Sequence, residues 1–258
     1  MRKFFWLMTM VAVLAVVIGS PLQAQAKNKK QEPAAPVSES VAGELFQKTC
    51  KILAALKGYS FQAEVLMDVI FPDGAKIQIA RNMDVVVQRP KSFKIVTTGD
   101  EGQATSVFDG KTFTLALLHK KIYGQIPAAM ETDALVAFLS EKYDLDSPLG
   151  DLLLNDTCGK MNATTASYVG KGYVGKILCH HLFFQSKDID WQIWLEDNDK
   201  QLPRKLVITE KKLPNSPQFT AFINNWQIVD SPASAFAFTA PADLSRDGNL
   251  FTHKKWLQ

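Results

Sequence analysis

Residues 190–226 form three short strand-like runs, and apolar side chains occur on both faces of these runs. The runs are separated by clusters of Pro, Asn and Asp, which is typical of an antiparallel meander. The first run places Trp191, Ile193 and Leu195 on one face. Trp194 points to the other face, although a half-buried strand normally keeps that face polar. Both faces are therefore expected to meet something other than water, such as a covering helix, a second sheet or an apolar ligand.

The chain before this meander predicts one helix followed by about six antiparallel strands. Apolar residues three or four apart form one stripe over 40–56, and Gly58 is a natural end for that helix. Apolar and polar residues then alternate over 61–69 and again over 77–87, which predicts two paired strands. Further strands follow, including a hairpin with Asp109-Gly110 at its turn.

The pattern changes in the middle of the chain. Helical spacing returns over 127–143, and a short apolar helix is expected within 147–154. Strands resume near Tyr168 and are expected to end near Phe236 and Phe238. The order helix, strands, helices, strands predicts an α+β fold in which a single curved antiparallel sheet wraps around helices.

The N-terminus predicts export. A basic start at Arg2 and Lys3 precedes an apolar run over 4–18, and Ala24-Gln25-Ala26 fits a cleavage site. A membrane anchor is the alternative, but the run is short for a span of about 20 residues. We therefore expect a signal peptide over 1–26 and a polar, flexible tether over 27–37. A single half-barrel domain would occupy 38–258.

Charge and motifs exclude several classes of function. The net charge of +3 falls to about +1 once the signal peptide leaves, and no basic stripe suggests nucleic acid. The G-x-G-x-x-G pattern over 170–175 precedes a strand instead of a helix, so it predicts a hairpin and no dinucleotide cofactor. The pair His180-His181 would point to opposite faces of a strand, which argues against a metal site. No nucleophile and base can be paired, so no enzymatic activity is expected.

The sequence contains three cysteines. Cys50 lies in the helical pattern and is interpreted as a small buried apolar residue. Cys158 and Cys179 flank a Gly-rich turn and a strand, and they form the favoured disulfide bond. Three free thiols are the alternative.

Several short segments together resemble a family of predicted exported bacterial proteins of unknown function, family 2092 of the unknown-function series. The segments that carry the resemblance are Asp109-Gly110-Lys111-Thr112, Tyr168-Val169-Gly170, Cys179-His180-His181-Leu182, Asp190-Trp191-Gln192, Leu202-Pro203 and Pro217-Gln218-Phe219. That family is similar in turn to the LolA-like superfamily of periplasmic lipoprotein carriers. The resemblance implies an incomplete β-barrel closed by helices, with a concave face that holds acyl chains. An arginine that controls cargo in the carriers has no clear counterpart, and Arg81 and Arg89 are candidates by strand position only.

These observations predict a periplasmic, non-enzymatic binding protein that needs no cofactor or metal. Its expected partners are a lipid or a lipidated protein, with possible contact to a membrane surface. The alternative is an envelope sensor or interaction module that binds a protein partner. Eight strand residues are predicted to line the cavity: Val65, Ile79, Ile95, Phe113, Trp191, Trp194, Ile208 and Phe222.

Overall fold

The computed structural model describes residues 40–143, 145, 149–156 and 163–251. The predicted signal peptide over 1–26 and the predicted tether over 27–37 lie outside these residues, so both remain predictions. The described helices are α1 (Val41–Ala55), α2 (Thr132–Tyr143) and the short 3₁₀ helices η2 (Leu118–Lys120), η3 (Gly150–Leu153) and η4 (Ala233–Phe236).

Twelve strands in the described part of the chain join one sheet. Its first half contains β1 (Gly58–Ile70), β2 (Lys76–Gln88), β3 (Ser92–Gly99), β4 (Gly102–Phe108), β5 (Thr112–Leu117) and β6 (Ile122–Pro127). Its second half contains β7 (Thr165–Val174), β8 (Ile177–Gln185), β9 (Ile189–Glu196), β10 (Pro203–Glu210), β11 (Gln218–Gln227) and the short β12 (Ser245–Arg246).

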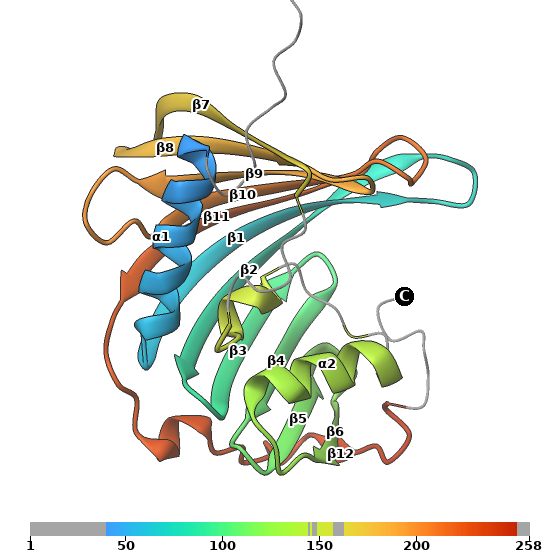
Figure 1. The fold of residues 1–258 in the computed structure, drawn as a ribbon. Coiled ribbons are helices and arrows are strands. Elements are labelled where there is room, and N and C mark those ends of the chain that lie inside the picture. The colour runs from blue at the N-terminus through green and yellow to red at the C-terminus, as the bar shows by residue number, and fades with distance from the viewer. Residues whose placement is uncertain (1–39, 144, 146–148, 157–162, 252–258) are drawn as a thin grey trace, which may run out of the picture. The chain divides into compact units, whose positions relative to one another are not determined.

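The strand order is β12-β6-β5-β4-β3-β2-β1-β11-β10-β9-β8-β7. Each half is a meander of sequential antiparallel neighbours, and the antiparallel pair β1–β11 joins the two halves. β12 pairs with β6 in parallel. The sheet is open, because β12 and β7 are its two edges, and it curves around the helices (Figure 1). The predicted α+β fold with one curved, mostly antiparallel sheet is confirmed.

Cross-strand pairing defines the inner face of the sheet, which is the face toward the helices. Val65 on β1 is opposite Ala221 on β11, and Ala221 is opposite Leu206 on β10. Directly opposed residues share a face, so the inner face can be followed from β5 to β8. Two apolar clusters cover it, one beneath α2 and η3 and one beneath α1.

Helix α1 covers the inner face of the second half. Ser40 caps it, since the Ser40 hydroxyl accepts a hydrogen bond from the Gly43 N–H at 3.0 Å. The buried face of α1 includes Phe46, Thr49 and Leu53, of which Thr49 and Leu53 belong to the predicted apolar stripe. Such a short helix depends on this packing for its stability.

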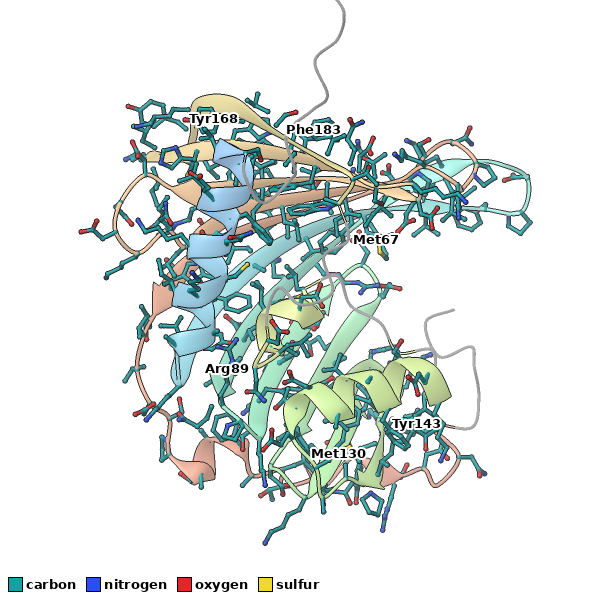
Figure 2. All side chains as sticks on the ribbon, in the orientation of Figure 1. Met67, Arg89, Met130, Tyr143, Tyr168 and Phe183 are labelled. Atoms are coloured by element: carbon teal, nitrogen blue, oxygen red, sulfur yellow. The ribbon has the colours of Figure 1, made fainter. Side chains whose placement is uncertain are left out.

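Arg89 joins α1 to the first half of the sheet (Figure 2). Its guanidinium donates to the carbonyl oxygens of Leu53 and Leu56 at the end of α1, and to that of Leu152 in η3 at 3.4 Å. The guanidinium also lies 5.1 Å from the ring centre of Tyr59. These contacts satisfy carbonyl groups that the end of a helix leaves free.

Two sequence predictions need correction. The predicted bridge between Cys158 and Cys179 is wrong, because Cys179 is a free, buried thiol. Within the sheet, Cys179 is opposite Gly172 on β7 and Glu196 on β9, and neither of these residues is a cysteine. Cys50 is half-buried and disulfide-bonded, and was wrongly interpreted as a simple apolar residue. Cys158 lies outside the described residues.

The second correction concerns the end of the sheet. Strand β11 ends at Gln227, and the residues around Phe236 form η4 instead of a strand. Phe236 is fully buried. Its apolar character therefore reflects packing against the body of the protein.

Candidate functional site

A cavity of about 340 Å³ lies on the inner face at one end of β2–β5. Its volume falls within the range of small-molecule sites. The described residues that line it are Arg81, Thr97, Gly99, Glu101, Gly102, Gln103, Ala104, Ser106, Phe113, Leu115, Leu117, His119, Lys120 and Leu145.

The floor of the cavity is largely apolar. Phe113, Leu115 and Leu117 are successive inner-face residues of β5, and each exposes 6% of its surface or less. Leu145, which follows α2, adds a further apolar side chain. The same strand therefore contributes both to the core beneath α2 and to the floor of the cavity.

The hollow exists because the neighbouring strands carry small residues. Ala104 on β4 is opposite Thr97 on β3, and Gly102 is opposite Gly99 two pairs further along. Ser106 continues the inner face of β4. Large side chains at these positions would fill the space, as they do elsewhere on the inner face.

The rim of the cavity is charged. Arg81 on β2 forms an ion pair with Glu101 in the β3–β4 turn, and both side chains are partly exposed. His119 in η2 packs over Gly102, where an added Cβ would lie 2.6 Å from the imidazole ring. The His119 Nδ1 atom is 3.1 Å from the carbonyl oxygen of Gln103. Lys120 follows at the exposed edge.

The structure distributes the eight predicted lining residues over four places. Phe113 lines the cavity. Val65, Ile79 and Ile95 share its face but lie outside the cavity lining among the described residues. Trp191 and Ile208 are on the inner face of the second half, in the cluster under α1. Trp194 and Phe222 are opposite Lys205 on the outer face, so they cannot line this cavity.

The inner face under α1 is filled by aromatic rings. Trp191 stacks on Phe184 with ring centres 3.8 Å apart. Phe46 from α1 meets both rings edge-on, at 5.2 Å from Trp191 and 5.3 Å from Phe184. This aromatic cluster leaves α1 tightly packed on the sheet, in contrast to the hollow next to β3 and β4.

The outer face carries a row of stacked side chains across β8–β11, which we call the outer ladder: His181, Trp194, Lys205 and Phe222. The imidazole of His181 lies 3.9 Å from Trp194, almost parallel to it. The Lys205 ammonium lies 4.6 Å from the Trp194 ring centre and 5.0 Å from that of Phe222. These cation–π contacts cover apolar surface that would otherwise face water.

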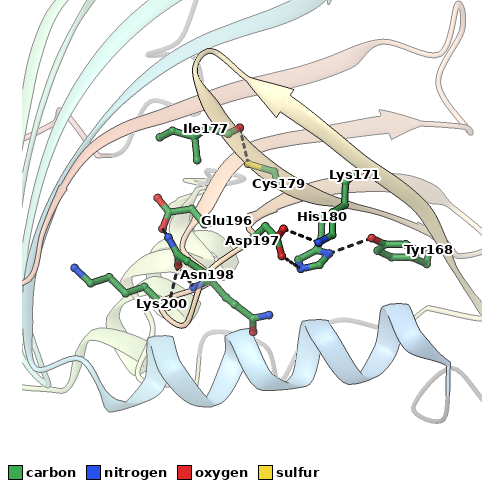
Figure 3. Close-up of polar contacts among 10 residues, drawn as sticks. Tyr168, Lys171, Ile177, Cys179, His180, Glu196, Asp197, Asn198 and Lys200 are labelled. Carbon is green, nitrogen blue, oxygen red and sulfur yellow. Dashed lines mark hydrogen bonds and ion pairs between the residues drawn. The ribbon is translucent and has the colours of Figure 1, made fainter.

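The histidine pair points to opposite faces, as predicted. His180 is held between Tyr168, whose hydroxyl lies 3.1 Å from Nδ1, and Asp197, whose Oδ1 lies 2.8 Å from Nε2 (Figure 3). Asp197 also accepts from Lys171 at 2.6 Å, and this hydrogen bond is the main reason that the pKa of Asp197 is lowered. Burial lowers the pKa of His181, which favours its neutral form.

These histidines do not form a metal centre in the described part of the chain, where no group of three His, Cys, Asp or Glu side chains is placed to hold a metal ion. The Cys179 thiol is equally inert, since burial raises its pKa to about 11. Among the described residues, no helix is long and apolar enough to span a membrane.

A second hollow of about 480 Å³ lies over the β1–β11 pairing irregularity and is lined by residues that include Gln62, Asp84 and Asn225. Its polar groups bond to one another: Gln62 donates to Asp84 at 2.7 Å and accepts from Asn225. These groups are therefore engaged with one another, and the cavity on the inner face is the better candidate site.

Sequence reasoning missed most of the cavity lining. Arg81 was a candidate by strand position, but Ala104, Leu115, Leu117 and Lys120 were not singled out. The available signal was the pair of glycines that flank the turn Gly99-Asp100-Glu101-Gly102, with Ala104 shortly after it.

Several solved structures are similar to this chain. An uncharacterized conserved protein from Thermus thermophilus has a TM-score of 0.46 and 10% identity, over 81% of this chain and 100% of that one. Lipoprotein LppX from Mycobacterium tuberculosis has a TM-score of 0.47 and 13% identity, over 73% of this chain and 96% of that one. A LolA superfamily protein from Nitrosomonas europaea has a TM-score of 0.38 and 10% identity, over 76% of this chain and 97% of that one. At such low identity these structures do not indicate what this chain binds.

No curated protein matches the sequence significantly. A family described as "Predicted periplasmic protein (DUF2092)" matches residues 42–246, from the second residue of α1 to the end of β12. The matched range includes all twelve described strands of the sheet, and it contains the complete cavity lining. The chain therefore belongs to the DUF2092 family of predicted periplasmic proteins.

Proposed function

We propose that this protein is a periplasmic, non-enzymatic binding protein that holds a lipid, an acyl chain or another amphiphile in the cavity on the inner face. The signal peptide predicted over 1–26 would direct its export and then be cleaved. The observation that carries the proposal is the cavity itself, in which an apolar floor lies beside a charged rim. An amphiphile has the same two parts.

The floor supplies the binding energy in this proposal. Burial of an apolar tail against Phe113, Leu115 and Leu117 contributes about 25 cal/mol per Å² before the cost of ordering the ligand. The rim would orient the polar head toward water. A lipidated protein could present such a tail as well as a free lipid.

The test is binding of a fluorescent fatty acid by the full mature protein and by Ala104→Trp. Ala104 lies between β3 and β5 on the inner face, so an indole there fills the cavity. We expect uptake by the native protein and loss of uptake in this variant. Thr98→Trp is the matched control, because Thr98 is exposed and lies on the opposite face from Thr97.

Native mass spectrometry of protein purified from its own envelope gives an independent test. The expected result is a co-purified lipid that is absent from Ala104→Trp. A clean apo mass together with no uptake of the fluorescent fatty acid would contradict the proposal.

The outer ladder favours a second candidate function, an envelope sensor or interaction module. Trp194 and Phe222 are only half-buried, and aromatic side chains are enriched at protein interfaces. A photo-crosslinker placed at Trp194 would give one defined adduct in the envelope under this alternative. The same crosslinker at Thr98, also on the outer face, is the control.

A further inference from the structure

We infer that the cavity selects a single-chain amphiphile with an anionic head, and that Arg81 is the residue that recognises this head. The inference rests on the proposed function and narrows it. Three features of the cavity support it: its volume, the charges on its rim and the donors that Arg81 still has available.

The volume limits the tail to one chain. A water-sized group occupies about 30 Å³, so a cavity of about 340 Å³ accommodates roughly eleven such groups. A methylene group is of similar size, and a chain of about ten to twelve carbons would fill the space.

The charges on the rim favour an anion. Arg81 and Lys120 line the cavity with one carboxylate, that of Glu101, and His119 adds a titratable imidazole. The neighbouring Asp100 is directed elsewhere, since its Oδ2 accepts from the Ala80 N–H at 2.8 Å. The formal charge of the lining is therefore positive even with His119 neutral.

Arg81 has donors to spare. A guanidinium carries five N–H groups, and the ion pair with Glu101 involves the terminal Nη2 atom. The remaining donors lie in the fork geometry that matches a carboxylate or a phosphate. Val65 packs opposite Arg81 across the β1–β2 pair, which places the base of the side chain on the inner face.

The strand positions beside Arg81 are glycines, and the His119 imidazole packs over Gly102. Gly99 is directly opposite Arg81 in the β2–β3 pair, and Gly102 is opposite Gly99 in the β3–β4 pair. Neither residue has a side chain that would separate the guanidinium from the mouth of the cavity. A carboxylate head of a fatty acid and a phosphate head of a monoalkyl phosphate share this recognition chemistry.

The experiment is calorimetric titration of the mature protein with four twelve-carbon ligands, each below its micellar concentration: dodecanoate, dodecyl phosphate, dodecanol and dodecyltrimethylammonium. We expect at least one anion to bind about tenfold more tightly than dodecanol, and the cation to bind most weakly. The comparison of dodecanoate with dodecyl phosphate distinguishes the two sources of anionic head.

Arg81→Gln should remove the preference for the anion over dodecanol. Lys120→Gln, at an exposed position, should reduce the preference two- to threefold. Lys94→Gln is the control, since Lys94 lies on the outer face opposite Val86 and Val107. Equal affinity for dodecanoate and dodecanol, or a preference that survives in Arg81→Gln, would overturn the inference.

The failure of this inference can be told apart from failure of the proposed function. Uniform binding of all four ligands that is lost in Ala104→Trp supports an amphiphile site without anion recognition. Binding of none of them by the native protein contradicts both proposals. Tight binding of a diacyl phosphatidate in the same cavity would overturn the single-chain part.

Discussion

The two halves of the inner face differ in one respect that decides their roles. Under α1, Trp191 and Phe184 stack at 3.8 Å and Phe46 closes over them. Next to β3 and β4, the equivalent layer holds Thr97 and Ala104 and leaves a cavity of about 340 Å³. The same sheet thus forms a packed core in one half and a hollow in the other. Side-chain size, and not strand topology, sets the difference.

The comparison extends to the outer face. Trp194 is three residues after Trp191 in sequence, yet it lies on the other side of the sheet between His181 and Lys205. Apolar residues on both faces of β9 therefore do not require a ligand on both faces. Long cationic and aromatic side chains can cover one another.

The largest effect on stability is expected from removing an aromatic side chain from the cluster under α1. Trp191→Ala removes a ring that is 4% exposed and contacts both Phe46 and Phe184. We expect the free energy of unfolding to fall by about 3–5 kcal/mol, because the cavity left behind cannot collapse between helix and sheet. Urea denaturation measures the change.

Trp194→Ala is the matched control on the same strand. Its ring is half-buried on the outer face, so we expect a loss of about 1–2 kcal/mol. Equal losses for the two tryptophans would show that the inner and outer faces of β9 are packed to the same degree.

The second prediction concerns the junction of the two halves, where Tyr59 is buried on β1. Burial raises the pKa of Tyr59 to about 12, from an ordinary value of 10.0, and its hydroxyl donates to the Leu152 carbonyl. Folding therefore favours the neutral phenol. This contribution is complete below pH 10 and is lost as the pH rises toward 12.

The rise in the pKa of Tyr59 from 10.0 to about 12 corresponds to about 3 kcal/mol in the free energy of unfolding, which is lost at high pH. The native protein should lose this stability between pH 10 and 12. The Tyr59→Phe variant has no phenol to ionise, so its free energy of unfolding should fall about 3 kcal/mol less over the same range. Urea denaturation at several pH values measures both slopes. Parallel slopes would show that Tyr59 ionises freely in the folded state.

The third prediction compares the contributions to stability of Arg81 on β2 and Arg89, which directly follows β2. Arg89 donates to carbonyl groups of Leu53 and Leu56, and Arg89→Met would leave them without this partner. We expect a loss of about 1–3 kcal/mol in the free energy of unfolding. Arg81→Met should cost less than about 1 kcal/mol, since its ion pair with Glu101 is partly exposed.

Thermal and urea unfolding of both variants give the comparison. If Arg81→Met were as destabilising as Arg89→Met, the rim of the cavity would be a structural element and its role in ligand recognition would lose support.

Much of the fold follows from local sequence patterns. The helix stripe over 40–56 and the alternation over 61–69 and 77–87 predicted α1, β1 and β2, because burial of one face imposes a period on the residues. The end of the sheet was mispredicted, since Phe236 is buried in a short helix and the sequence shows burial without showing backbone conformation.

The site was much harder to predict than the fold. Phe113 was identified because it belongs to a strand with a strong pattern. Trp194 and Phe222 were predicted as lining residues, but a strand residue points to one face only. Their pairing with Lys205 on β10 places both on the outer face, and this register is not evident from the sequence. The cavity also exists because the side chains at Gly99 and Ala104 are absent or small. Small residues of this kind give little signal in a single sequence.

The smallest effect is expected inside the cavity. Thr97→Val replaces a hydroxyl that lines the hollow with a methyl group of similar size. The free energy of unfolding should change by less than about 0.5 kcal/mol, because no large group is removed from the core. The affinity for a twelve-carbon tail should rise about twofold, since the new methyl group adds apolar surface to the floor.

Thr98→Val is the matched control, because Thr98 is the next residue and lies on the exposed outer face. It should leave the affinity unchanged in the same calorimetric titration. Weaker binding in Thr97→Val would mean that the hydroxyl bonds to the ligand, so that the polar head and not the tail lies beside β3. The direction of this small change therefore reports how the amphiphile is oriented in the hollow, which the larger effects on stability cannot reveal.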